Sequence, residues 1–250
     1  MNEVKLIIGN WKMNGMFVDS CERVEQLIAC VDESDSSAFK MVLCPPATLM
    51  SLVAGMVKDS PIKLGGQDCH DKDFGAYTGD ISAQMLREIG AEFVIVGHSE
   101  RREYHSESSE LVAEKAKAAH SNGLVAVICV GERDIERETG KHKDFVSRQL
   151  EVSIPDTANA DNTIIAYEPV WAIGTGKTAS QADIEEMHAF IRYKLENILT
   201  SGADVPVLYG GSVKSSNAKE ILHIANVNGV LVGGASLKAS EFCAIATASN

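Results

Sequence analysis

The chain consists almost entirely of short apolar runs that alternate with amphipathic stretches, and the alternation continues from one end to the other. The apolar runs predict strands at residues 4–9, 40–44, 62–65, 93–96, 124–130, 163–167, 205–209 and 230–232. Helices are expected between them at residues 20–31, 48–57, 82–89, 109–119, 143–152, 182–199, 216–224 and 238–246. The expected strands are apolar throughout, which is typical of parallel strands buried on both faces.

Eight strand–helix units follow one another without a linker or a break in composition, and this favours one α/β domain over residues 1–250. Eight parallel units of this total length predict a closed (β/α)8 barrel, the TIM barrel. A doubly wound open sheet is the alternative, and only the number of elements favours the barrel over it. The hydrophobic content of 45% is ample for one large core.

Composition also limits the function. A net charge of −12 argues against a general nucleic-acid-binding protein. It does not exclude an anionic substrate, because a site needs only a local positive potential. Neither a signal peptide nor an apolar run of about 18 residues is present, so we expect a soluble, cytoplasmic protein without a membrane partner.

The cysteines are scattered along the chain without the CxxC spacing of zinc or redox sites. We therefore expect a reducing compartment and buried free thiols at Cys21, Cys30, Cys44, Cys69, Cys129 and Cys243.

A carboxylate stands at the end of the sixth expected strand. Glu168 follows the apolar run 163–167, and Pro169 disfavours a helical conformation in the residue before it. A glycine-containing stretch comes next and suits a lid that shields a general base from water. The expected lid comprises Pro169, Val170, Trp171, Ala172, Ile173, Gly174, Thr175, Gly176, Lys177, Thr178 and Ala179.

Polar residues and glycines follow several other expected strands, and a barrel builds its site from that rim. Asn10 and Lys12 follow the first strand, and His98 follows the fourth. Gly210-Gly211-Ser212 follows the seventh strand and Gly233-Gly234 the eighth. Because backbone N–H groups of such loops bind anions, and the last two loops of a barrel are its usual phosphate site, we expect phosphate there.

His98 stands at a strand end, where we expect Ser99 to cap a helical turn and Glu100 to lie near its positive end. The charged form of an imidazole near a helix N-terminus is disfavoured. A neutral His98 would then donate a hydrogen bond to a substrate oxygen, and Lys12 would supply permanent positive charge.

Five segments, in order along nearly the whole chain, make it resemble the triosephosphate isomerase family. They are Asn10-Trp11-Lys12-Met13-Asn14-Gly15, Gly97-His98-Ser99-Glu100-Arg101-Arg102, the stretch from Ala166 to Gly176, Tyr209-Gly210-Gly211-Ser212-Val213 and Val232-Gly233-Gly234-Ala235-Ser236-Leu237. The resemblance implies interconversion of dihydroxyacetone phosphate and D-glyceraldehyde 3-phosphate through an enediolate. The reaction serves glycolysis and gluconeogenesis and needs neither cofactor nor metal.

The resemblance also implies residue roles. Glu168 would move the substrate proton from C1 to C2, and the neutral His98 would polarise the carbonyl, as is known for this family. Lys12 would stabilise the enediolate, and Asn10 would bind a substrate oxygen. N–H groups of Gly174, Ser212, Gly233 and Gly234 would hold the phosphate. Glu100 would be a buried partner in the network, with Ser99 beside it.

The loop from Gly66 through Thr78 resembles the loop that joins two copies of this enzyme into a homodimer. Two departures from the family pattern are Asp68, where asparagine is common, and Asn226-Val227-Asn228, where the family commonly has Asp-Val-Asp. The missing carboxylates put in doubt the ion pairs of those positions with Arg192 and Lys238. The alternatives are another phosphosugar barrel enzyme, such as a lyase or amino-sugar isomerase, and a catalytically silent phosphate-binding barrel.

Overall fold

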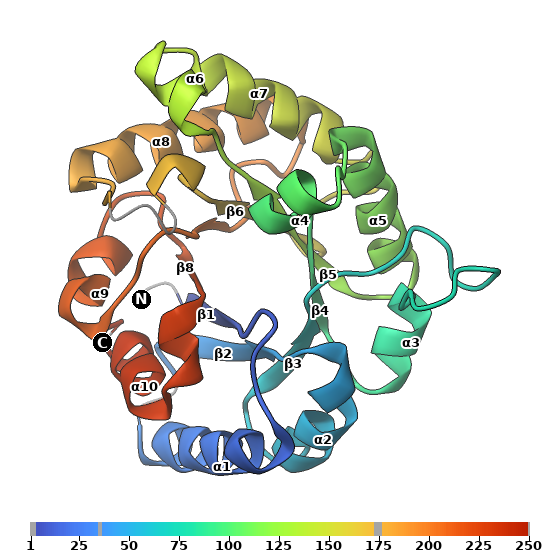
Figure 1. Ribbon diagram of the computed structural model, residues 1–250. Coiled ribbons are helices and arrows are strands. Elements are labelled where there is room, and N and C mark those ends of the chain that lie inside the picture. The colour runs from blue at the N-terminus through green and yellow to red at the C-terminus, as the bar shows by residue number, and fades with distance from the viewer. Residues whose placement is uncertain (1–3, 35–36, 173–176, 250) are drawn as a thin grey trace.

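A closed barrel of eight parallel strands forms the centre of the molecule, and helices surround it (Figure 1). The computed structural model describes residues 4–34, 37–172 and 177–249. The strands are β1 (Lys5–Asn10), β2 (Phe39–Cys44), β3 (Lys63–Gly66), β4 (Phe93–Val96), β5 (Val125–Val130), β6 (Thr163–Tyr167), β7 (Val207–Tyr209) and β8 (Gly229–Val232). They pair in sequence order, and β8 closes on β1 in parallel register. The predicted TIM barrel is confirmed.

Helices follow the strands on the outside of the barrel (Figure 1). They are α1 (Phe17–Glu33), α2 (Ala47–Val57), α3 (Ala83–Glu88), α4 (Ser99–Tyr104), α5 (Ser109–Ser121), α6 (Asp134–Glu138), α7 (His142–Ser153), α8 (Gln181–Ile198), α9 (Ser215–Leu222) and α10 (Ala239–Thr247), with 3-10 turns η1 (Val170–Ala172) and η2 (Gly234–Leu237). The short elements α6, η1 and η2 add to the predicted helices, and α4 is the helical turn expected after His98. All four lie beside the ends of strands.

Successive strand residues point to opposite faces of the sheet, and this divides the core in two. In β1, Ile7 packs outward among the helices, whereas Ile8 packs inside the barrel. The same alternation places Leu43 outside and Val42 inside in β2. Because both faces are apolar, the strands lack the polar alternation of a half-exposed sheet, as the sequence predicts. Within the described part of the chain, no helix is long and apolar enough to cross a membrane.

The seam between the first and last strands is tightly packed. Gly9 of β1 has no side chain, and a Cβ there would lie 3.0 Å from the Phe242 ring of α10 and 3.1 Å from the side chain of Ser236. Phe242 is fully buried. Glycine at residue 9 therefore lets the last helix lie directly against the first strand.

Two of the cysteines are not free thiols, which corrects the expectation from the sequence. Cys30 of α1 and Cys243 of α10 form a disulfide. Cys44, Cys69 and Cys129 are buried free thiols, as predicted, whereas Cys21 is only partly buried. The sequence did not indicate the pair because its members are 213 positions apart and meet only when the barrel closes.

The Asn226 and Asn228 departures are accommodated at the amino-terminal end of the barrel. The Asn228 amide oxygen accepts hydrogen bonds from the Arg192 guanidinium at 3.1 Å and from the Val207 N–H at 2.8 Å. Asparagine therefore keeps a contact with Arg192 without a carboxylate. Lys238 lies elsewhere, among the residues that line the pocket at the other end of the barrel.

Candidate active site

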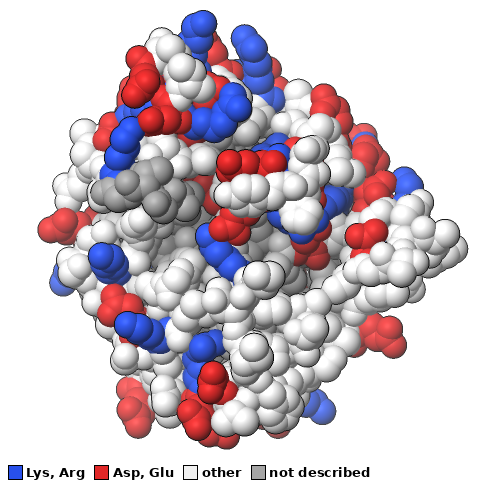
Figure 2. Space-filling view, in the orientation of Figure 1, with Lys and Arg blue, Asp and Glu red and all other residues white. Residues whose placement is uncertain are grey.

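A pocket of about 460 Å³ lies at the carboxyl end of the barrel. Its lining includes all the described residues that the sequence predicts to contact substrate: Asn10, Lys12, His98, Glu168, Ser212, Gly233 and Gly234. These residues end or follow five different strands, and the closed barrel brings them to one rim. Basic and acidic side chains meet at the hollow in this face (Figure 2). The fold therefore brings these residues together in one pocket.

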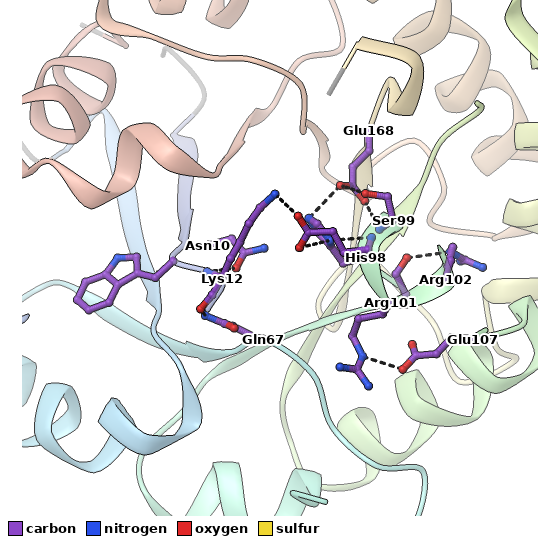
Figure 3. Close-up of polar contacts among 12 residues, drawn as sticks. Asn10, Lys12, Gln67, His98, Ser99, Arg101, Arg102, Glu107 and Glu168 are labelled. Atoms are coloured by element: carbon purple, nitrogen blue, oxygen red, sulfur yellow. Dashed lines mark hydrogen bonds and ion pairs between the residues drawn. The ribbon is translucent and has the colours of Figure 1, made fainter. Parts of the chain in front are cut away.

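Glu168 is buried at the end of β6, with only 1% of the residue exposed. Its carboxylate accepts hydrogen bonds from the Ser99 N–H and the Ser99 hydroxyl, each at 2.9 Å, and lies 3.0 Å from His98 Nε2 (Figure 3). Burial alone would raise the pKa of Glu168, but His98 and Ser99 together lower it. The carboxylate is therefore favoured in its ionised form although it is almost fully buried.

Gly97 and the start of α4 determine how His98 enters the site. Gly97 has a φ of +65°, which turns the chain at the end of β4. His98 is then the N-cap of α4, and its Nδ1 accepts the N–H of Glu100 at 3.3 Å. Since Nδ1 accepts, a neutral His98 carries its proton on Nε2, the nitrogen that faces Glu168. The same nitrogen is available to donate to a substrate oxygen.

The expectation that the charged form of His98 is disfavoured does not hold in this arrangement. Burial lowers the pKa of His98, but the Glu168 carboxylate raises it by more, so the net shift is upward. Lys12 opposes protonation and Glu100 favours it. Burial and Lys12 are therefore the influences that favour the neutral imidazole, and the Glu168 and Glu100 carboxylates together outweigh them.

Ser99 and Glu100 differ from their predicted places. Ser99 is the first residue of α4 rather than its cap, because His98 occupies the cap position. Its two donors therefore face Glu168 instead of the helix. The Glu100 side chain is 43% exposed, so the prediction of a buried partner is wrong. It does join the network, since its carboxylate lies 2.6 Å from Lys12 Nζ.

Lys12 has a backbone conformation that L residues seldom adopt, with a φ of +52°. Its N–H donates to the Asn10 side-chain oxygen at 3.0 Å, and its carbonyl accepts the Gln67 amide at 2.8 Å. Non-glycine residues held at positive φ cluster at functional sites and are kept there by surrounding contacts. Asn10 and Gln67 are these contacts, and they aim the lysine across the pocket (Figure 3).

The two glycine-bearing loops that the sequence predicts for phosphate both line the pocket. Gly233 lies beside Lys12, because a Cβ at Gly233 would be 3.4 Å from Lys12 Cε. Gly210 lies beside the base, since a Cβ there would be 3.0 Å from Glu168 Cγ. Ser212 and Gly234 are exposed to the pocket mouth. These loops therefore bring backbone N–H groups close to both proposed reactive side chains.

The centre of the expected lid, Ile173 to Gly176, lies outside the described residues, and so does the expected phosphate contact Gly174. The flanks are described. Pro169 precedes η1, which spans Val170, Trp171 and Ala172, and Lys177, Thr178 and Ala179 precede α8. The Trp171 indole N–H donates to Glu132 at 2.8 Å. Lys177 forms an ion pair with Asp134 at 2.7 Å. Both partners follow β5.

The sequence reasoning overlooked Gln67 and Glu132. Gln67 directly follows β3 and holds the Lys12 carbonyl. Glu132 is fully buried after β5 and accepts the Tyr167 hydroxyl at 3.0 Å as well as the Trp171 indole. The same pattern that predicted the other site residues could have found them, namely a polar residue one or two positions after a strand end. Among the described residues, no group of three His, Cys, Asp or Glu side chains is placed to hold a metal ion.

Known proteins match this chain over nearly its whole length. The family model "Triosephosphate isomerase" matches residues 5–249. The triosephosphate isomerases of Rhizobium meliloti (strain 1021) and Bartonella henselae are 50% and 52% identical, and each match covers 96% of this chain and 94% of the relative. A crystal structure of the Bartonella henselae triosephosphate isomerase superposes with a TM-score of 0.90 at 48% identity, covering 98% of both chains. None of these matches supports the alternative functions, and the chain belongs to the triosephosphate isomerase family.

Proposed function

We propose that Glu168 is the base that interconverts dihydroxyacetone phosphate and D-glyceraldehyde 3-phosphate in this member of the family. One observation carries the proposal: an ionised carboxylate, 1% exposed, faces a pocket that also contains His98 and Lys12. A buried carboxylate has no hydration shell to lose when it approaches a C–H bond. Glu168 takes the proton from C1 of the ketose and returns it to C2 of the enediolate.

His98 and Lys12 stabilise the negative charge that forms on the substrate oxygens. Neutral His98 donates from Nε2, because its Nδ1 is occupied by the Glu100 N–H. Lys12 supplies a fixed cation, and Asn10 both orients the Lys12 backbone and contributes an amide to the pocket. Donors and cations that are already in place stabilise developing charge strongly, since they need little reorganisation during the reaction.

The phosphate is held by N–H groups of Ser212, Gly233 and Gly234, and by Gly174 of the lid segment. The support is the position of the first three residues in the same pocket as the proposed base. Glycine permits a phosphate oxygen to approach the backbone closely. Binding the remote phosphate fixes the distance between C1 and the Glu168 carboxylate, which favours proton transfer.

Turnover of triose phosphates by the purified chain in a coupled assay is the first test. Glu168→Gln keeps the side-chain shape and removes the basic oxygen, so its kcat should fall by about 1000-fold or more. Glu92→Gln is the matched control, because Glu92 pairs with Lys63 at the other end of the barrel and is absent from the pocket. Equal activity in the two variants would exclude Glu168 as the base.

Two further proposals concern the setting of the enzyme. We propose a homodimer that uses the Gly66–Gly79 loop, including Thr78. The loop protrudes from the barrel (Figure 1), and its Phe74 is 84% exposed. Large exposed apolar side chains indicate a contact surface.

We also propose that residues 1–250 form one domain, because β8 closes on β1. The proposed place of the enzyme is the cytoplasm, where glycolysis occurs.

A further inference from the structure

A disulfide joins the first and the last helix of the barrel, and the isomerase reaction does not use it. Cys30 lies in α1, the first helix, and Cys243 lies in α10, the last. Neither residue lines the active-site pocket. Both residues are partly exposed rather than buried in the core. We propose that Cys30 and Cys243 form a reversible, redox-sensitive clamp on the seam where the barrel closes.

The position of the bond allows it to change the stability of the fold. β1 pairs with β8, and these strands are formed by the parts of the chain that are farthest apart in sequence. Pairing such distant segments costs more chain entropy than pairing any two strands that are consecutive in the sequence. A cross-link between positions 213 residues apart removes this cost by restricting the unfolded chain.

Noncovalent contacts also join the first and last parts of the chain at this seam. The Arg23 guanidinium of α1 donates to the Leu237 carbonyl at the end of η2 at 2.8 Å, seven positions before Cys30. Positions seven apart lie on the same face of a helix, so Arg23 and Cys30 both face the last βα unit. Because these contacts and the packing of Phe242 on Gly9 do not involve sulfur, the reduced chain can keep the same arrangement.

Exchange with a low-molecular-weight disulfide is the chemistry that would close the clamp. One protein thiolate attacks a sulfur of the small disulfide, breaks its S–S bond and releases the first small thiol. The second protein thiolate then attacks the mixed disulfide and releases the second. The two protons lost by Cys30 and Cys243 end on the two released thiols. A small dithiol or excess monothiol reverses both steps, so the state of the clamp follows the thiol–disulfide balance of its surroundings.

Cys21 provides a matched control on the same helix. It is a free, partly exposed thiol in α1, as Cys30 would be when reduced. No described cysteine other than Cys243 is disulfide-bonded to α1. Any general effect of thiol reagents on α1 should therefore appear at Cys21 as well, whereas an effect of the clamp should need both Cys30 and Cys243.

The experiment equilibrates the purified full chain in oxidised and reduced glutathione at a series of ratios. Free thiols are then alkylated under denaturing conditions and counted by intact mass, and Tm is measured on the same samples. Oxidised samples should show four alkylated cysteines and reduced samples six, with a peptide linking Cys30 to Cys243. The oxidised Tm should exceed the reduced Tm by about 5–10 °C.

Variants then assign the effect to the pair. Cys30→Ser and Cys243→Ser should each abolish the redox dependence of Tm and match the reduced wild type, while Cys21→Ser should retain the full shift. Six free thiols at every glutathione ratio would overturn the proposal. So would equal Tm values for the form with four free thiols and the form with six. Loss of the shift in Cys21→Ser would also overturn it, because a different pair would then be responsible. The wild-type comparison requires no substitution, so a variant that fails to fold does not prevent the test.

Discussion

Ser99 donates both of its polar hydrogens to Glu168, from its N–H at 2.9 Å to one carboxylate oxygen and from its hydroxyl at 2.9 Å to the other. The relationship joins the residues that follow β4 and β6, the two strands on either side of β5. It stabilises the ionised carboxylate in a fully buried place, where burial alone would favour protonation. As the proposed base, Glu168 would have to give up these hydrogen bonds before it reached a substrate proton.

Ser99→Ala should move the acid limb of the activity profile to higher pH. The variant loses the hydroxyl donor, so the lowered pKa of Glu168 should return toward its ordinary value. Because the base must be ionised, kcat/KM of the free enzyme falls as pH drops through that pKa. The measurement is the pH dependence of kcat/KM. Ser108→Ala, which removes a hydroxyl that caps α5, is the control and should leave the limb in place.

Gln67→Leu should reduce kcat by roughly tenfold while the barrel remains folded, because a slight misplacement of a catalytic group is costly. Gln67 donates to the carbonyls of Lys12 at 2.8 Å and Cys44 at 2.9 Å, and leucine can make neither bond. Lys12 then keeps its positive φ with one restraint fewer. Steady-state kinetics with circular dichroism test this. Gln26→Leu on the exposed face of α1 is the control. Equal kcat values for the two variants would show that Gln67 does not position Lys12.

The free energy of unfolding should decrease as pH falls from about 6.5 to about 4, because His188 is buried in its neutral form. The ring is fully buried, and burial lowers the pKa of His188 to about 4. Over that range the unfolded chain binds a proton that the folded chain does not, so the free energy of unfolding decreases as pH decreases. The stabilisation is fully present above the unfolded pKa, and its loss amounts to about 3 kcal/mol at most.

Urea unfolding at pH 7 and pH 5 measures this effect. His188→Gln should be less stable than the wild type at pH 7, and its loss of stability between the two pH values should be smaller. His105→Gln, at an exposed position, should follow the wild type. If wild type and His188→Gln lost the same free energy between pH 7 and pH 5, titration of His188 would not contribute to acid sensitivity.

Deleting residues 71–75 should produce a weakly active monomer. The deletion removes Phe74, which is 84% exposed, and shortens the loop that carries Tyr77, which is 43% exposed. Without this apolar surface the proposed dimer loses its main contact. Sedimentation velocity gives the mass directly. An unchanged dimer would place the interface elsewhere, and a wild-type monomer would exclude the dimer itself.

Periodicity predicted the strands and long helices, and the count of eight strand–helix units favoured the barrel over an open sheet. The predicted limits of β4 and β6 coincide with the observed ones. The helical turn α4 was expected after His98, but α6, η1 and η2 were not predicted, since so few residues show no period. The strand-end rule identified Asn10, Lys12, His98 and Glu168 as neighbours, and the pocket contains all four.

What the sequence could not predict depends on which side chains meet across the barrel. The two donors of Ser99 reach Glu168 because His98, not Ser99, caps α4. Glu100 remains 43% exposed because Lys12 holds it at the pocket side rather than in the core. The Cys30–Cys243 bond depends on closure of β8 onto β1, which no local pattern encodes.

The most direct test of the central claim is the kcat of Glu168→Asp, measured with its circular dichroism. Aspartate keeps the charge and shortens the side chain by one methylene, which draws the base back from C1 by about 1 Å and should lower kcat about 100-fold. The spectrum should match the wild type, because the shorter carboxylate can still be ionised at the end of β6. A folded Glu168→Asp enzyme with wild-type kcat would contradict the assignment of Glu168 as the base.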